Sequence, residues 1–68
     1  MWIKINKSDG KIGIINTDNL QSMILRWNEP LQFHIEFVFT SGEIWLSSGV
    51  DTLESAQTNL DEIFGKLL

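Results

Sequence analysis

The residues of this chain that could perform acid–base chemistry are few. His34 is the only imidazole among the 68 residues, and Glu36 follows it two positions later. Such a pair becomes hydrolytic when a serine nucleophile joins it, and Ser41, Ser47 and Ser48 are nearby in the sequence. The chain has neither a nucleophile elbow nor a glycine-rich oxyanion loop. We therefore interpret His34 as an ordinary half-exposed strand residue, and we predict a protein that is not an enzyme and has no catalytic residue.

Carboxylates are more numerous, and Asp61 with Glu62, or Glu54 with Asp61, have the residue types of a glycosidase pair. Adjacent helix positions point in different directions, and positions seven apart lie two turns apart on the solvent side. A chain of 68 residues also lacks the walls of a sugar cleft. The absence of cysteine and the single histidine exclude thiolate sites and leave too few ligands for zinc. We therefore predict no metal, no cofactor and no small-molecule substrate.

Acidic side chains are concentrated in the second part of the chain. The net charge is −4, but residues 1–27 carry four basic and two acidic side chains, whereas residues 28–68 carry one basic and seven acidic. Around the predicted helix the acidic residues are Asp51, Glu54, Asp61 and Glu62. They are most simply a solvated helix face. They could also form an acidic surface that occupies a basic site on another protein.

Lysines near the start of the chain suggest a second kind of partner. Lys4, Lys7 and Lys11 could form a basic patch near Trp2, and aromatic plus basic side chains on a sheet bind single-stranded nucleic acid. An acidic chain is poorly suited to this role, because binding to phosphate backbones depends on lysine and arginine releasing counterions. Lysines on edge strands also discourage aggregation between sheets, which is the simpler interpretation.

Hydrophobic periodicity predicts the elements that position these groups. Aromatic or branched residues recur at every second position from Phe33 to Phe39. Successive side chains on a strand point to opposite sides, so these residues should share one face. Such a face needs a cover, and the last eighteen residues supply an amphipathic helix. Its apolar stripe consists of Leu53, Ala56, Leu60, Ile63, Phe64 and Leu67.

The predicted fold is α+β, with a single domain over residues 1–68 in two layers. We expect an antiparallel sheet of four or five strands with one C-terminal helix packed across one face. The strands are expected at about 2–7, 11–16, 21–27, 32–40 and 43–48, and the helix at about 52–66. Residues 18–27 fit either helical or strand spacing, and the short distance to Pro30 favours a strand. Asp51, with Glu54 three residues later, has the form of a capping box.

Turn residues and apolar pattern together predict how the strands pair. Asp9-Gly10 predicts a two-residue hairpin loop of type I′, which would set Ile5 opposite Ile14. A continuous apolar face between the third and fourth strands would pair Trp27 with Phe33, Leu25 with Ile35 and Met23 with Phe37.

The last hairpin decides which side chains remain on the outer face of the sheet. Ser41-Gly42 is not ideal for a type I′ turn, so the apolar pattern must set the register. It places Phe39 opposite Ile44, and Phe37 opposite Leu46. The outer face of this hairpin would then carry His34, Glu36, Val38, Glu43, Trp45 and Ser47.

Trp45 and Val38 are therefore predicted to be neighbours on the outer face, and Trp2 could extend the patch. An exposed apolar patch on a small protein often marks a protein–protein contact, and aromatic residues are enriched in interface cores. A small core that needs further stabilisation favours self-association, and a symmetric dimer is the simplest form. The alternative interpretation is a single exposed aromatic residue of no special significance.

The order of these features resembles a known layout. Ile15-Asn16 is followed by Leu20, an alternating strand, a glycine turn at Gly42, another strand and an acidic helix. Over roughly residues 12–64 this resembles short bacterial proteins of the flagellar FlbD type and similar uncharacterised phage or bacterial families. The resemblance implies an all-antiparallel sheet with a C-terminal helix and a non-enzymatic role. It carries no functional residue across.

Three functional hypotheses follow from the sequence. The first is a non-catalytic protein-interaction or assembly module that self-associates through the outer sheet face. The second is an acidic inhibitor or mimic, for instance phage-encoded, that occupies a basic site on a host protein. The third is a weak binder of single-stranded nucleic acid. No uninterrupted apolar run exceeds three residues, so we expect no membrane partner, and a cytoplasmic location.

Overall fold

The computed structural model describes the backbone of residues 1–67 and the side chains of residues 1–65. Within that part the strands are β1 (Trp2–Asn6), β2 (Ile12–Asn16), β3 (Leu20–Asn28), β4 (Gln32–Phe39) and β5 (Ile44–Leu46). A 3-10 turn, η1 (Thr17–Asn19), precedes β3, and one helix, α1 (Leu53–Leu67), follows the strands. The predicted α+β class with a C-terminal helix is confirmed, and the ambiguous segment before Pro30 is a strand.

The five strands form two antiparallel sheets, β1–β2 and β3–β4–β5, where the sequence had suggested one. A single bridge between Lys7 and Ser47 links the two. It is flanked by a hydrogen bond from Ser48 N–H to the Asn6 carbonyl, of 2.8 Å. The contact between the two sheets is confined to this point. β5 ends at Leu46, and no strand continues along the rest of β1 on this side.

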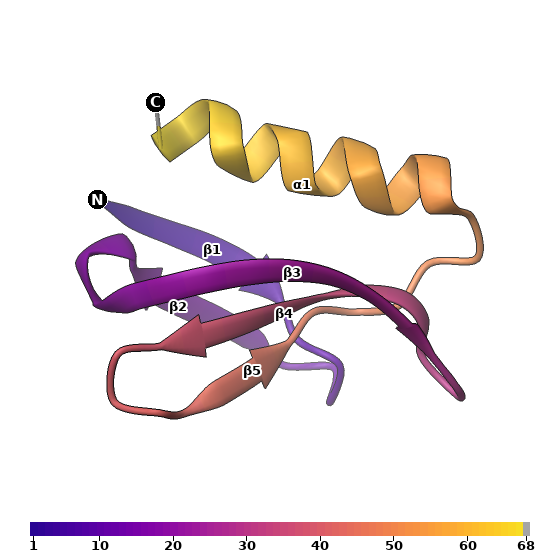
Figure 1. Cartoon of the computed structure of the whole chain (residues 1–68), viewed down its shortest axis with the longest axis horizontal. Helices are drawn as coiled ribbons and strands as arrows, with labels where there is room; N and C mark the ends of the chain where they lie inside the picture. The colour runs from indigo at the N-terminus through magenta and orange to yellow at the C-terminus, as the bar shows by residue number, and fades with distance from the viewer. Residues whose placement is uncertain (68) are drawn as a thin grey trace.

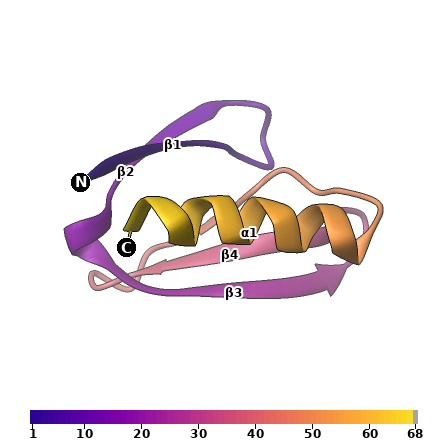
Figure 2. The same ribbon diagram turned by 90° about the horizontal axis from the view of Figure 1, so that it is seen from above.

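The elements are arranged in two layers (Figures 1 and 2). The sheet β3–β4–β5 forms one layer. The helix α1 lies over β3 and β4, and the β1–β2 hairpin runs beside the helix (Figure 2). The helix and the hairpin therefore together cover one face of the larger sheet.

The core lies where these parts meet. Phe37 of β4 has no exposed surface, and Ile35 is 2% exposed. The other buried apolar residues are Ile3, Ile5, Ile15, Phe39 and Ala56. The alternation predicted for β4 is confirmed on these residues, and so are the pairs Met23–Phe37, Leu25–Ile35 and Trp27–Phe33.

The helix buries less of its stripe than the periodicity suggested. Leu60 and Ile63 pack against the core as expected. Leu53 and Phe64, however, are 54% and 48% exposed, and the helix shares this face of the sheet with the hairpin (Figure 2). The side chain of Leu67 is outside the described residues.

The capping box predicted at the start of the helix is wrong in its residues. The Ser55 backbone N–H donates to Oγ1 of Thr52 over 3.1 Å, and the helix begins at Leu53. Thr52 therefore serves as the N-cap in place of Asp51, since its hydroxyl satisfies one of the free N–H groups of the first turn.

Both predicted hairpin registers are wrong by one residue, and for the same reason. The Lys7 N–H donates to the Lys11 carbonyl over 2.9 Å, which closes a loop of three residues ending at Gly10, with φ of +85°. A three-residue loop with a glycine in the left-handed region is the alternative to a two-residue type I′ loop. Ile5 therefore lies opposite Gly13, not Ile14.

In the β4–β5 hairpin the Phe39 N–H donates to the Glu43 carbonyl over 2.9 Å, and Gly42 takes φ of +91°. Phe37 therefore pairs with Trp45, not with Leu46. A change of one residue in register moves every side chain of a strand to the other face. Trp45 consequently turns toward the core, and Ile44 and Leu46 take the outer face.

Candidate functional site

Trp45 packs against the core instead of forming an outer patch with Val38. Its ring meets that of Phe39 edge to face, with centroids 5.0 Å apart. Its indole Nε1–H donates to the Glu43 carboxylate over 2.9 Å. Val38 is half-buried on the opposite face of the sheet, where it pairs with Ile44. The predicted Trp45–Val38 patch is therefore wrong, and Trp45 has a structural role.

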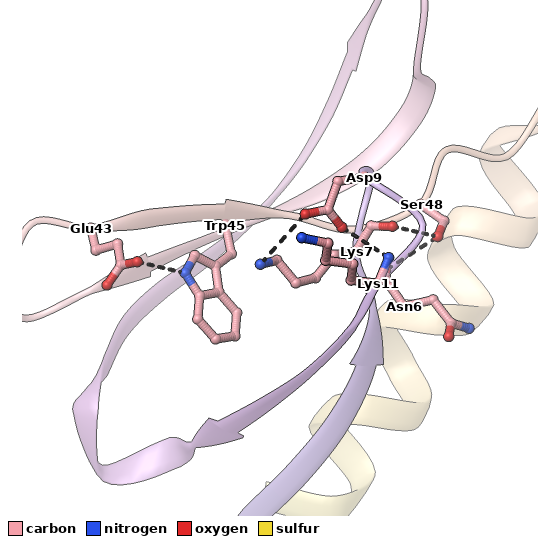
Figure 3. Close-up of polar contacts among 7 residues, drawn as sticks. All are labelled: Asn6, Lys7, Asp9, Lys11, Glu43, Trp45 and Ser48. Atoms are coloured by element: carbon pink, nitrogen blue, oxygen red, sulfur yellow. Dashed lines mark hydrogen bonds and ion pairs between the residues drawn. The ribbon is translucent and has the colours of Figure 1, made fainter.

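Lys7 completes the contact between the hairpin and β5. Its ammonium lies 4.5 Å from the centre of the Trp45 ring and 3.9 Å from the Asp9 carboxylate (Figure 3). The Ser48 hydroxyl beside it donates to the Asn6 carbonyl over 3.2 Å. Lys7 is thus already engaged with Trp45 and Asp9 within the fold, which gives no support to the nucleic-acid hypothesis.

Replacing Lys7 by methionine keeps most of the aliphatic stem and removes the cation above the indole. We expect the free energy of unfolding to fall by about 0.5–1 kcal/mol, the usual size of such an interaction. Urea denaturation followed by tryptophan fluorescence measures it. Lys11→Met is the control, because Lys11 is exposed and its side chain has no partner among the described side chains. Equal losses in the two variants would contradict the assignment.

His34 and Glu36 have separate partners in the structure. His34 is 1% exposed, not half-exposed, and its Nδ1 lies 3.0 Å from the Gln32 carbonyl oxygen. The Glu36 carboxylate instead accepts from Arg26 Nε at 2.8 Å. Among the described side chains, no serine hydroxyl is hydrogen-bonded to His34. The imidazole is therefore buried without a nucleophile.

The most exposed apolar surface lies on the outer side of the β1–β2 hairpin. Trp2 is 68%, Ile12 63% and Ile14 60% exposed. The register sets Ile14 opposite Lys4, so Trp2 and Ile12 flank this pair along their strands on the same face. We call these three apolar side chains, together with Lys4, the hairpin face. A group of this kind on a small protein is typical of a contact surface.

The sequence suggested Trp2 as an extension of the Trp45–Val38 patch, whereas the structure places it on the separate β1–β2 sheet. The two isoleucines of the hairpin face were not singled out. β2 has isoleucine at both even- and odd-numbered positions, so alternation alone does not show which isoleucines turn outward. Only the true length of the loop between β1 and β2 would have shown it. With a three-residue loop, Gly13 and Ile15 align with Ile5 and Ile3 on the inner face, and Ile12 and Ile14 remain outside.

The outer face of the larger sheet is less uniformly apolar. The Arg26–Glu36 ion pair crosses it, and it separates Ile24 on β3 from Leu46 on β5. Ile44 is 54% exposed, whereas Val38 is half-buried. A charged pair in the middle of a surface makes its burial costly unless the partner matches it. The hairpin face is therefore the better candidate.

The predicted acidic surface is present as exposed side chains on and before α1. Asp51, Glu54, Asp61 and Glu62 are all exposed. Asp61 accepts a hydrogen bond from Gln57 Nε2 over 3.0 Å. The two ion pairs of the described side chains, Lys7–Asp9 and Arg26–Glu36, involve none of the four.

Other kinds of site find no support in the described residues. Within them no group of three or more His, Asp or Glu side chains could hold a metal ion. No helix in the same part of the chain is long and apolar enough to cross a membrane.

Scans against protein-family models, against curated proteins and against solved structures gave no match. The resemblance to FlbD-type proteins stays a prediction.

Proposed function

We propose that the protein is a non-catalytic interaction module that self-associates through the hairpin face. The observation that supports this most strongly is the exposure of Trp2, Ile12 and Ile14 on one side of a two-stranded sheet. Burial of apolar side chains stabilises association at roughly 25 cal/mol per Å², so three large residues can make the centre of an interface. Trp2 is the natural anchor, because tryptophan is enriched among residues that dominate binding energy.

The charge distribution favours a second copy of this chain as the partner. The acidic residues of α1 lie in the second part of the chain, residues 28–68, which carries one basic and seven acidic side chains. The hairpin face itself contains one charge, that of Lys4. Two copies that meet at this face keep their many carboxylates out of the contact, which limits repulsion between two chains of net charge −4. A small domain with a limited core also gains stability from self-association.

Replacing Trp2 by glutamate should weaken self-association at least tenfold, because a charge would be buried in the centre of the interface. Sedimentation velocity and light scattering across micromolar to millimolar protein measure the effect. Trp27→Glu is a matched control, since Trp27 is also highly exposed, at 55%, but lies near the far end of β3. A wild-type chain that is monomeric at millimolar concentration would contradict the proposal, and so would equal effects of the two variants.

The acidic-mimic hypothesis remains the second candidate, favoured by the exposure of all four carboxylates around α1. This hypothesis differs from the first in the surface that binds the partner, which is the group of carboxylates around α1 and not the hairpin face. Replacing Glu54 and Asp61 by lysine should leave self-association through the hairpin face intact. The same change should abolish binding to a basic partner, and that binding should weaken steeply with salt.

A further inference from the structure

The hairpin face carries its one charge in the middle. Even-numbered residues of β1 lie opposite even-numbered residues of β2, so the side chains on this side of the sheet form three cross-strand rows. The rows are Trp2 with Asn16, Lys4 with Ile14, and Asn6 with Ile12. Trp2 and Ile12 therefore lie at opposite ends of the surface, and Lys4 lies in the row between them.

This position of Lys4 affects every contact that uses the whole face. Residues two apart on a strand are separated by about 7 Å, so the rows of Trp2 and Ile12 are about 13 Å apart. A partner that covers both of these side chains also covers the row between them. The Lys4 ammonium must then lose its hydration or be carried on its flexible stem to the rim of the contact, and both changes oppose association.

The hairpin face supplies no carboxylate that could offset this cost. The polar side chains beside Lys4 on the same side of the sheet, Asn6 and Asn16, are uncharged. The two ion pairs among the described side chains, Lys7–Asp9 and Arg26–Glu36, do not include Lys4. In a symmetric contact both copies bring the same lysine to the interface. Each ammonium then approaches its equivalent or faces apolar side chains of the other copy.

We propose that the charge of Lys4 limits the strength of self-association through the hairpin face and keeps the assembly reversible. This inference rests on the proposed function and adds to it the residue that regulates the contact. Charges placed among apolar side chains of exposed strands are one means by which sheet proteins avoid permanent association. Loss of the positive charge at this one position should therefore tighten the assembly.

The other two lysines of the hairpin lie outside the three rows. Lys7 contacts the Trp45 ring and the Asp9 carboxylate. Lys11 precedes β2 in the loop, and its side chain is exposed. A contact centred on Ile14 can leave the Lys11 ammonium in water. Lys11 is therefore the matched control for Lys4.

The test compares Lys4→Met with Lys11→Met by sedimentation velocity across micromolar to millimolar protein. Each variant loses one positive charge, which changes the net charge from −4 to −5, and gains an apolar side chain. General repulsion between acidic chains therefore rises equally in both. Lys4→Met should nevertheless associate at least tenfold more tightly than wild type, because no ammonium has to be buried. Lys11→Met should not associate more tightly, and Lys4→Arg, which keeps the charge, should show none of the gain.

The double variant Lys4→Met with Trp2→Glu shows where the gain arises. It should lose the gain, because both positions belong to the same face, and circular dichroism will show that each variant is folded. Association of Lys4→Met that equals or falls below that of wild type would overturn the inference, and so would a gain that survives Trp2→Glu. If Trp2→Glu weakens the wild-type assembly but Lys4→Met does not tighten it, this inference fails and the proposed function stands. If wild type and Lys4→Met are both monomeric at millimolar concentration, both fail.

Discussion

Replacing Gly49 by alanine should destabilise the fold by about 1–3 kcal/mol or more, because the added methyl group would force the backbone to shift. A Cβ at this position would overlap the carbonyl oxygen of Leu31 and lie 2.6 Å from its carbonyl carbon. Both atoms are backbone, so no side-chain rotation relieves the conflict. The paired hydrogen bonds between Phe33 and Val50, of 3.1 and 2.8 Å, hold the two segments together at this point.

This loss is large for so small a protein. Typical stabilities of 0.05–0.15 kcal/mol per residue amount to about 3–10 kcal/mol for 68 residues. Urea denaturation measures the change. Gly65→Ala is the matched control, because nothing lies near its Cβ position and it sits within α1. That variant should gain stability by up to about 1 kcal/mol, since alanine is the better helix former. A Gly49→Ala variant as stable as wild type would contradict the close approach.

The second large effect concerns Phe37, whose side chain has no exposed surface at the centre of the core. Phe37→Ala should cost about 3–5 kcal/mol, because it removes buried apolar surface and leaves a cavity. The melting temperature should fall by roughly 4–8 °C for each kcal/mol in a domain of this size. Scanning calorimetry or thermal circular dichroism measures it.

Phe64→Ala is the natural comparison for that experiment, since Phe64 is 48% exposed on α1. It should lose about 1 kcal/mol or less, as partly exposed side chains do. Similar losses at the two phenylalanines would mean that β4 does not form the centre of the core.

The apolar alternation of β4 was sufficient to predict the central part of the fold. One face of β4 is buried, and the pairing of Met23 with Phe37 and of Leu25 with Ile35 follows from matching apolar faces. The placement of Leu60 and Ile63 against that face also follows from the helical stripe. These predictions depend on periodicity, which is averaged over many residues and tolerates local error.

The hairpin loops could not be predicted in the same way, because a single glycine is compatible with two loop lengths. Gly10 and Gly42 fit either a two-residue or a three-residue loop, and the choice changes the register by one. For β5 that choice decides whether Trp45 or Leu46 faces Phe37. The candidate site was therefore misplaced at Trp45.

The burial of His34 was also beyond sequence reasoning. The outer positions of β4 are expected to be solvated, yet His34 is buried near the start of β4, where Gln32 is in the left-handed region with φ of 66°. Long-range packing decides the exposure of such a residue, and no local pattern reports it.

The central claim is that Trp2 faces a second copy of the chain while Trp45 faces the core. The three tryptophans give three indole N–H signals in a ¹⁵N-labelled sample, and single Trp→Phe variants assign them. As the protein concentration rises from micromolar to millimolar, the Trp2 signal should shift, and the Trp45 signal, held by its hydrogen bond to Glu43, should not. A Trp2 signal that stays fixed while that of Trp45 moves would contradict the account.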